Sequence, residues 1–291
     1  MDSEPLVYII LVNYNGYYDT LECVHSFDNN NYTNYKIVVV DNCSKDSAKL
    51  RNDAYLNNKC EIIFSSHNGG FSYANNLGIT HALKNKADFI VLLNNDTVVP
   101  FDFIKELLKS YRINNEPSLI SCRINYYTEP DKTNFCGGYY NSKKGMALYY
   151  NPKTEDTGSR YITFATGCMF FIPKKTIEVV GLLDENYFMY GEDTDYCLRI
   201  VKKGLKIFFD GTITIYHKIS SSSGNNSDFT QYYIMRNSLN NVKKYSLNKP
   251  YSYLYHIYWI IKGVIERRKH FKPNFWGYLD FIGHKQGKFR Y

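Results

Sequence analysis

Residues 1–100 alternate between short apolar runs and longer segments of mixed polarity. Four apolar runs rich in β-branched residues have the length of strands: VYIILVN (Val7–Asn13), KIVVVDN (Lys36–Asn42), CEIIF (Cys60–Phe64) and DFIVLLN (Asp88–Asn94). Their hydrophobicity is continuous, as in strands covered on both faces. Helix-length segments follow them, beginning near Gly16, Ser44, Gly70 and Phe101. The pattern predicts an α/β fold with a mostly parallel central sheet flanked by helices.

Each of these predicted strands is followed by polar residues or glycine. In chain order they include Asn13 and Asn15, Asp41 and Asn42, Asn68 and Gly70, and finally Asn94, Asn95 and Asp96. Any one group could be a turn or a helix cap, and Asp41 to Ser44 would cap the next helix well. Because ligands of parallel sheets bind beyond the carboxyl ends of the strands, four such groups at one edge favour a binding crevice.

The second half of the chain is more mixed. Short strand-like runs occur between residues 118 and 173, and helices are expected at Lys174–Val180 and from Glu192 to Gly204. Two strands, LKIFF and TITIYH, should come next. The segment SSSSGNNSD (Ser220–Asp228) has too little apolar content to pack and predicts a mobile loop, and two further helices should close the chain.

Composition, the length of apolar runs and the spacing of cysteines argue against several classes of protein. The chain is 44% hydrophobic and 22% charged, which is ordinary for a globular protein. The N-terminus has no signal-like region, and no run reaches the roughly 18 apolar residues of a membrane span. Seven scattered cysteines without a C-x-x-C pair argue against a zinc site and a disulfide framework. We therefore expect a cytoplasmic protein.

Common nucleotide-binding and hydrolase motifs are missing. The sequence has no G-x-G-x-x-G after the first strand, no G-x-x-x-x-G-K-[ST] and no G-x-S-x-G. The stretch YFMYGEDTDYCLRIVKKG instead places Glu192, Asp193 and Asp195 at the start of a helix, beside aromatic residues. Carboxylates there can compensate the helix dipole. An apolar setting can also raise the proton affinity of a carboxylate and suit it to act as a general base.

Six motifs occur in the order of a known enzyme family between about residues 6 and 218. They are VNYNG, VVVDNCSKD, NGGFSYANNLGI, LLNNDTVV, ATGCMFFI and LLDENYFMYGEDTDYCLRIVKKG. The chain resembles family 2 glycosyltransferases of the GT-A fold, particularly the bacterial rhamnosyltransferase-like branch that builds cell-surface polysaccharides such as capsule and lipopolysaccharide O-antigen. The resemblance implies a GT-A catalytic domain over residues 1–218, with a nucleotide-binding half (1–100) and an acceptor-binding half (101–218). Residues 219–291 match no motif and should form the loop and a helical, basic extension.

The resemblance also implies roles for single residues. Asp41 would hydrogen-bond the pyrimidine ring of the donor, and the nucleotide and sugar would contact Asn13, Asn15, Asn42, Asn68, Gly70, Asn75, Asn94 and Asn95. Asp96 matches the last acid of the Asp-X-Asp motif, which binds Mn²⁺ or Mg²⁺. Asp193, paired with Glu192, matches the general base. Thr166 and Gly167 match the floor of the acceptor site. His217 matches a further metal ligand of some members, although a packing or capping role is the alternative.

These residue types suit sugar transfer from a nucleotide diphosphate. A hard divalent cation with oxygen ligands neutralises the leaving diphosphate. One carboxylate can take the proton of the acceptor hydroxyl, and a single displacement inverts the anomeric centre. One departure matters: Asn94 stands where the family has its first Asp, which predicts weaker metal binding or a hydrogen bond from Asn94 to the ribose.

The expected function is therefore an inverting, metal-dependent glycosyltransferase. Its first expected donor is dTDP-rhamnose and its second a UDP-hexose, and its acceptor is a glycan or a lipid-linked oligosaccharide. A sugar nucleotidyltransferase is an alternative, but such an enzyme is expected to have a Gly-rich, basic loop after the first strand, and VNYNGYY is not one. A catalytically silent nucleotide- or sugar-binding subunit is the other alternative, because of Asn94.

The charge of the chain is concentrated at its end. Residues 262–291 hold eight Lys or Arg against Glu266 and Asp280, a balance of +6 within a formal net charge of +7. An aromatic, apolar stretch, PYSYLYHIYWII, precedes this region. Such a combination is typical of a helix at an anionic membrane surface, here the inner face of the plasma membrane. A core-packing helix or a homodimer contact is the alternative, and no nucleic-acid-binding module is recognisable.

Overall fold

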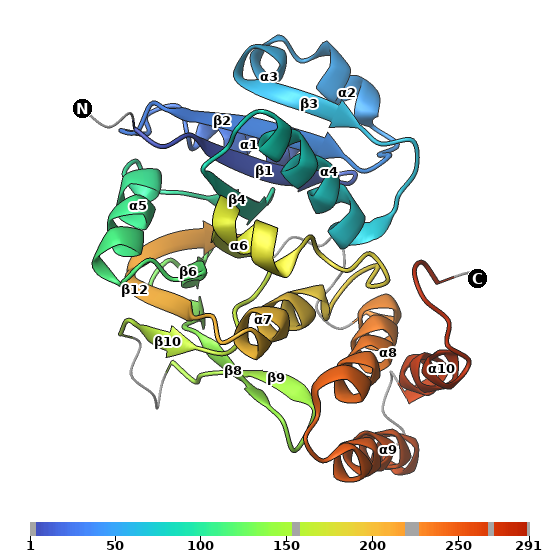
Figure 1. Ribbon diagram of the computed structural model, residues 1–291. Helices are drawn as coiled ribbons and strands as arrows, with labels where there is room; N and C mark the ends of the chain where they lie inside the picture. The colour runs from blue at the N-terminus through green and yellow to red at the C-terminus, as the bar shows by residue number, and fades with distance from the viewer. Residues whose placement is uncertain (1–3, 153–157, 219–226, 267–270, 290–291) are drawn as a thin grey trace.

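The computed structural model describes residues 4–152, 158–218, 227–266 and 271–289 (Figure 1). Its strands are β1 (Val7–Asn13), β2 (Tyr35–Asp41), β3 (Cys60–Phe64), β4 (Phe89–Asn94), β5 (Thr97–Val98), β6 (Leu119–Tyr126), β7 (Thr133–Phe135), β8 (Gly138–Asn141), β9 (Met146–Tyr149), β10 (Arg160–Ile162), β11 (Met169–Pro173) and β12 (Ile207–His217). Its helices are α1 (Tyr17–His25), α2 (Ser47–Asn52), α3 (Ala54–Lys59), α4 (Gly70–Lys84), α5 (Phe103–Ile113), α6 (Lys174–Val180), α7 (Glu192–Lys202), α8 (Asp228–Tyr245), α9 (Lys249–Ile265) and α10 (Phe271–Ile282).

A ten-stranded sheet forms the centre of the described chain. Its order is β10-β12-β6-β11-β4-β1-β2-β3, with β5 paired to β12 and β7 to β6. Strands β1 to β4 pair with one another in parallel, as the continuous apolar runs predict. Beyond β4 the sheet is mixed, because β11 runs antiparallel to both β4 and β6 while β6 and β12 are parallel.

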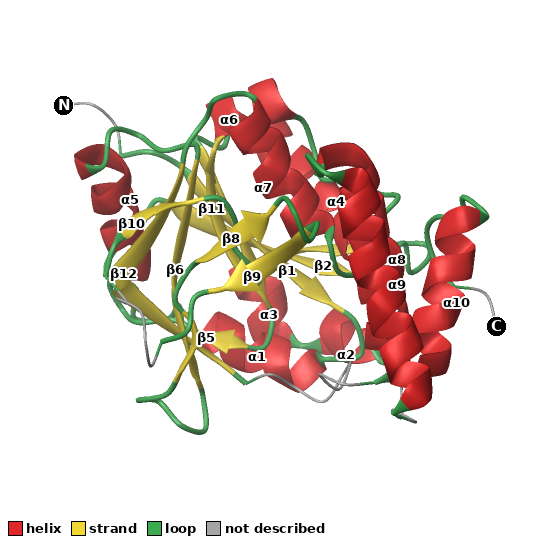
Figure 2. Cartoon of the chain, turned by 90° about the horizontal axis from the view of Figure 1, so that it is seen from below, coloured by secondary structure: helices red, strands yellow, loops and turns green. Residues whose placement is uncertain are grey.

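Helices cover both faces of the sheet. Figure 2 shows α4, α6 and α7 on one side and α1 and α3 on the other, which confirms the predicted α/β architecture. Residues Val7 to Leu11 of β1 are completely buried at the centre of the sheet. Helix α4 lies so close to β1 that a Cβ on Gly78 would stand 2.5 Å from Cγ2 of Ile10. Glycine at this position therefore permits the close packing of α4 that brings its N-terminus to the site described below.

Two sequence-based expectations about the second half were wrong. LKIFF and TITIYH do not form separate strands but the single strand β12, whose register shifts between Asp210 and Thr214. The Asp210 carboxylate accepts hydrogen bonds from the Thr212 amide (2.9 Å) and hydroxyl (2.6 Å), which stabilises the irregularity without ending the strand.

The described C-terminal residues form three helices where two were expected. Ser246 to Asn248 separate α8 from α9; Asn248 caps α9 by accepting from the Tyr251 amide, and Pro250 lies in its first turn. Residues 220–226 of the expected loop lie outside the described part of the chain, and Asp228, its last residue, begins α8. Figure 1 shows α8, α9 and α10 side by side next to α7. Within the residues described, no helix combines the length and the apolar character that crossing a bilayer requires.

Candidate active site

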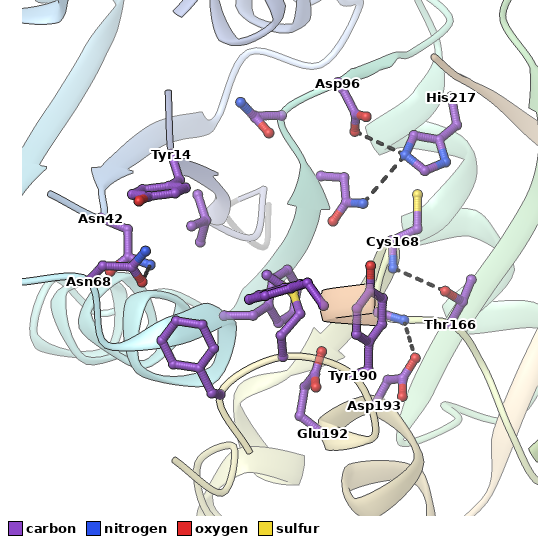
Figure 3. A pocket seen from close by; sticks show the side chains of 18 of the residues that line it. Tyr14, Asn42, Asn68, Asp96, Thr166, Cys168, Tyr190, Glu192, Asp193 and His217 are labelled. Carbon is purple, nitrogen blue, oxygen red and sulfur yellow. Dashed lines mark hydrogen bonds and ion pairs between the residues drawn. The ribbon is translucent and has the colours of Figure 1, made fainter. Parts of the chain in front are cut away.

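A cavity of about 580 Å³ opens beyond the carboxyl ends of β1 and β4. The walls include these residues singled out from the sequence: Asn42, Asn68, Asn94, Asn95, Asp96, Thr166, Gly167, Glu192, Asp193 and His217. Parallel strands bring the polar segments after β2, β3 and β4 to this one edge, as expected. Figure 3 shows Asn42 and Asn68 at one end of the cavity, Asp96 and His217 at a second, and Glu192 and Asp193 at a third.

Asn13, Asn15 and Asp41 do not line this cavity but build the loops beside it. The Asn13 amide donates to Asp41 Oδ1 (2.8 Å) and to Ser44 Oγ (3.0 Å), and its own oxygen accepts from Thr20. Asp41 is 1% exposed and also accepts from the Ser44 amide. Asn15 adopts a positive φ of 56° and accepts from the Lys45 amide. These contacts hold together the loops that follow β1 and β2.

The loop before α4 connects Asn42, after β2, to the segment that precedes α7. The Asn42 amide donates to Asn68 Oδ1 (3.0 Å) and to the Gly70 carbonyl (3.2 Å). Gly70 has φ +91°, and a Cβ there would stand 2.2 Å from the Phe188 carbonyl oxygen. That carbonyl accepts from the Phe71 amide (2.8 Å). Gly70 is therefore required where the two loops meet.

Asn75 lies one turn into α4 and also faces away from the cavity. It is 1% exposed, and its amide donates to the Phe71 carbonyl (2.9 Å). This bond ties the first turn of α4 together. The roles of Asn13, Asn15, Asp41, Gly70 and Asn75 in donor binding remain predictions.

Asp96 and His217 meet because β5 pairs with the end of β12. Thr97 lies opposite His217 in that pairing, which brings His217 Nε2 to 2.9 Å from Asp96 Oδ1 (Figure 3). The Asn94 amide lies 3.5 Å from the same imidazole nitrogen. Burial lowers the pKa of His217, but neighbouring Cys168 and Asp96 raise it more strongly, to about 11.

The donor set fits a divalent cation held jointly with a ligand. One carboxylate and one imidazole at the cavity wall leave other coordination positions for diphosphate oxygens and water, as hard cations prefer. Among the residues that the structure describes, no cluster of three or more His, Cys, Asp or Glu side chains could hold a metal ion. The weaker metal binding expected from Asn94 remains a prediction.

Glu192 and Asp193 are presented at the N-terminus of α7 by a tight turn. Tyr190 and Gly191, immediately before the helix, have φ of 62° and 90°. Asp193 Oδ2 accepts from the Gly167 amide (3.2 Å), and Oδ1 accepts from the Thr194 amide (2.7 Å). Each oxygen of the Asp193 carboxylate is thus oriented by one backbone N–H group, from Gly167 and from Thr194 in the first turn of α7. Figure 3 shows the Asp193 carboxylate beneath Tyr190 and next to Thr166.

The two adjacent carboxyl groups have different environments. Burial raises the pKa of Asp193, although the hydrogen bonds from Gly167 and Thr194 oppose the shift. Burial and the charges of Asp193 and Asp195 raise the pKa of Glu192 well above its usual value. Glu192 Oε2 has no hydrogen-bond partner in the described part of the chain. These two environments favour a neutral Glu192 beside an ionised Asp193, so the two carboxyl groups can have separate roles.

Asp195, the third acid at the start of α7, is buried and makes contacts within α7 and with α8. It is 1% exposed and accepts from Arg199 Nε (2.9 Å), Lys244 Nζ (2.9 Å) and the Tyr245 hydroxyl (2.6 Å). Lys244 and Tyr245 belong to the end of α8. At the acidic start of α7, Asp193 therefore lines the cavity, whereas Asp195 joins α7 to α8. The role of Asp193 as a base remains a prediction.

Sequence reasoning missed the contribution of α8 to the site. Asn237 donates to the carbonyls of Met189 (2.9 Å) and Tyr190 (2.6 Å), and Asn241 donates to that of Gly191 (3.2 Å). These asparagines, four residues apart, lie on one face of α8 and satisfy the carbonyls of the turn before Glu192. Phe229 and Lys288 also line the cavity, although they lie in the region without a recognisable motif. The available signal in the sequence was the pair Asn237 and Asn241, two amide side chains at helical spacing.

Comparison with known proteins identifies related glycosyltransferases. The profile of glycosyl transferase family 2 matches residues 8–181, more than half of the chain. The dTDP-rhamnosyl transferase RfbF of Shigella flexneri is 27% identical over 241 residues, which cover 80% of this chain and 78% of that protein. The rhamnosyltransferase WbbL of Escherichia coli K12 is 23% identical over 251 residues, covering 77% and 86%.

Solved structures show the same fold. GalNAc-T7 with UDP, GalNAc and Mn²⁺ matches with a TM-score of 0.68 and 17% identity, over 98% of this chain but only 59% of that one. S. aureus TarS 1-349 in complex with UDP matches with a TM-score of 0.55 and 15% identity, over 85% of this chain and 68% of that one. Both neighbours are GT-A glycosyltransferases, which confirms the expected GT-A fold. By its sequence profile, the chain belongs to glycosyltransferase family 2.

Proposed function

We propose that this glycosyltransferase is inverting and metal-dependent and uses a nucleotide-diphosphate sugar. The observation that carries the proposal is a single cavity with the Asp96–His217 pair at one end and the oriented carboxylate of Asp193 at another. Residues 1–100 would supply the nucleotide end and residues 101–218 the acceptor end. The UDP-bound neighbours GalNAc-T7 and TarS support a nucleotide-sugar donor.

Asp193 supplies the base in the proposed reaction. An acceptor hydroxyl near Thr166 and Gly167 gives its proton to Asp193 while its oxygen forms the bond to C1 of the sugar. The bond from C1 to the diphosphate oxygen breaks, and the nucleoside diphosphate leaves with the electron pair. One displacement inverts the anomeric centre, and no covalent enzyme intermediate forms.

Asp96 and His217 would hold the divalent cation, with Asn94 beside them. When bound, a cation such as Mn²⁺ or Mg²⁺ stabilises the negative charge that develops on the leaving diphosphate. His217 must release the proton it shares with Asp96 to act as a ligand, because the same Nε2 atom makes both contacts. Tyr190, Phe71 and Tyr149 border the cavity with aromatic surface and limit the access of water to the reacting groups.

The first proposed donor is dTDP-rhamnose, because RfbF, a dTDP-rhamnosyl transferase, matches across most of both chains. A UDP-hexose is the second. The proposed acceptor is a hydroxyl group on a capsule-like or O-antigen-like polysaccharide or on a lipid-linked oligosaccharide. Asn134 and Tyr149, from the second half of the chain, also line the cavity and would lie within reach of an acceptor glycan.

Purified protein should release free nucleoside diphosphate from one member of a panel of dTDP- and UDP-sugars when Mn²⁺ and an acceptor mixture are present. Coupled detection of the released diphosphate and mass spectrometry of the product would measure transfer. Binding of nucleotide without turnover across the panel would favour the silent subunit. Formation of a nucleotide-sugar from a sugar phosphate and a nucleoside triphosphate would favour the nucleotidyltransferase.

We also propose that α9 rests on an anionic membrane, with the protein peripheral on the inner face of the plasma membrane. Leu254, Tyr258, Ile261 and Ile265 are 52–75% exposed and recur at helical spacing along one face. Lysines Lys249 and Lys262 lie on the same helix, and the surrounding sequence carries most of the net charge. An apolar stripe bordered by basic residues complements an anionic lipid surface.

Vesicle sedimentation tests the membrane proposal. The protein should bind vesicles containing anionic lipid more strongly than neutral vesicles, and Leu254→Glu with Ile261→Glu should reduce binding about tenfold or more, by the loss of two apolar contacts. Ile113→Glu, at an equally exposed apolar position of α5, serves as the control and should bind like the wild type. Equal binding by all forms, or a dimer that the double variant dissociates, would overturn the proposal.

A further inference from the structure

We propose that Lys288, in the C-terminal tail, binds a phosphate oxygen of a substrate in the active-site cavity. Lys288 lines the cavity, and among the described residues of its wall it is the one lysine, with no arginine present. The wall also carries the carboxyl groups of Asp96, Glu192 and Asp193. Carboxylates in the wall repel the negative charge of a diphosphate, so cationic groups are needed to bind it. Lys288 can supply one of them.

The chain is anchored on both sides of Lys288. The Gly287 carbonyl accepts from Arg236 Nη1 (2.9 Å), and the Gly287 amide donates to the Asn186 carbonyl (3.2 Å). On the other side, the Phe289 amide donates to the Tyr233 hydroxyl (2.7 Å), and the Phe289 ring lies 3.9 Å from that of Tyr232. Two successive anchors leave little freedom for the backbone between them, so Lys288 is presented at a defined place.

Arg236 makes this anchor an integral part of the fold. Its side chain is 1% exposed, and its guanidinium lies 5.4 Å and 4.8 Å from the ring centres of Tyr232 and Tyr233. Its Nε donates to Asn237 Oδ1 (3.1 Å), and Asn237 in turn supports the turn before Glu192. Burying a guanidinium is costly unless its hydrogen bonds are used, and one of them goes to the tail. Arg236 and Asn237 of α8 thus hold both the tail at Gly287 and the turn before Glu192, called the acidic turn below.

The Lys288 ammonium group lies beside Phe188, another residue of the cavity wall. Its Nζ is 5.9 Å from the centre of the Phe188 ring. The Phe188 carbonyl contacts the Phe71 amide, directly after Gly70. Lys288 therefore lies near the junction between the Asn68–Gly70 loop and the acidic turn, where phosphate groups of either substrate can approach. An ammonium group on a flexible stem suits such a contact without demanding one geometry.

This inference rests on the proposed function, since it assumes that a phosphate-bearing substrate enters the cavity. The phosphate could belong to the nucleotide-diphosphate donor or to a lipid-diphosphate acceptor. Both present the same oxyanion chemistry, so the experiment must separate them. Removal of the charge should weaken whichever substrate makes the contact.

Isothermal titration with UDP and dTDP, with and without Mn²⁺, tests the donor contact. Lys288→Met should weaken nucleotide binding about tenfold, the usual range for one charge-assisted hydrogen bond, and Lys288→Arg should restore most of the loss. The control Lys272→Met removes a charge from exposed Lys272 of α10, outside the cavity wall, and should leave binding unchanged. Phe289→Ala, which loosens the anchor and keeps the charge, should produce a smaller loss in the same direction.

Steady-state kinetics separate the two sources of phosphate. If Lys288 contacts the acceptor, Lys288→Met should leave nucleotide binding intact and raise KM about tenfold for a lipid-diphosphate acceptor, but not for a neutral synthetic acceptor. If Lys288→Met matches Lys272→Met in nucleotide binding and in both KM values, the Lys288 proposal is overturned while the proposed function stands. If the wild-type protein neither binds nor consumes any nucleotide sugar, the proposed function fails and this inference fails with it.

Discussion

Replacing Asp193 with asparagine is expected to lower kcat for sugar transfer about 10²–10⁴-fold, the usual contribution of a general base. The substitution keeps the shape of the side chain but removes its ability to take the proton of the acceptor hydroxyl. Affinity for UDP or dTDP should change little, because Asp193 lies at a different end of the cavity from Asp96 and His217. Product formation and nucleotide titration, measured on the same preparation, check both parts.

Glu192→Gln is the matched control for this variant. Glutamine resembles the neutral carboxyl group that burial and the neighbouring acids favour at this position. The control variant should therefore keep far more activity than Asp193→Asn, and thermal unfolding should show that both remain folded. Near-normal turnover by Asp193→Asn, or an equal loss in Glu192→Gln, would contradict the assignment of the base to Asp193.

The pH dependence of kcat/KM provides an independent readout of the same group. A base works only when deprotonated, and burial raises the pKa of Asp193 above that of an exposed aspartate. Activity should therefore be present above this raised pKa and be lost as the pH falls through it. The acidic limb should disappear from the residual activity of Asp193→Asn.

Replacing Asp96 with alanine is expected to remove the dependence on Mn²⁺ and to lower kcat/KM about 10²-fold or more, because a bound cation stabilises the transition state by several kcal/mol. Asp96 supplies the carboxylate that contacts His217, so its loss leaves the imidazole and the amide of Asn94 among the described groups at this place. His217→Ala should have a smaller effect in the same direction, since the carboxylate would remain to attract the cation. Activity titrated with Mn²⁺ and UDP affinity with and without the metal would measure both variants.

Asp19→Asn is the control for the metal variants. Asp19 lies near this region and pairs with Lys218, the residue after His217, but it does not line the cavity. Removing its charge should leave the response to Mn²⁺ unchanged. If Asp96→Ala still responds to Mn²⁺ like the wild type, the cation does not bind at Asp96.

Local sequence pattern predicted the elements whose structure depends on nearby residues. The continuous apolar runs of β1 to β4 indicated strands buried on both faces, and the parallel sheet then required their polar ends to meet. Glu192 and Asp193 were correctly expected at the start of a helix. The pattern failed at Asp210 to Thr214, where the Asp210 carboxylate accepts from the amide and hydroxyl of Thr212 and one strand continues through a turn-like sequence.

Pattern alone could not decide which polar side chains would face the cavity. Asn13 and Asp41 end adjacent parallel strands, yet they bond to each other and to Ser44 and leave the wall to Asn42. The three acids of α7 share one turn, but Asp193 meets Gly167 while Asp195 meets Lys244. In each case the partner is distant in sequence, so periodicity carries no information about the contact.

The sequence by itself thus determined the class of fold and the edge of the sheet where the cavity opens, and it singled out Asp96 and Asp193, which both line that cavity. These follow from strand composition and from motifs whose residues are close together along the chain. Only the tertiary structure brought α8 and the tail to the site, through Asn237, Asn241 and Lys288. The physical reason is that buried carbonyls must find hydrogen-bond donors in space, and the donors to Met189, Tyr190 and Gly191 lie 47 to 50 residues away along the chain.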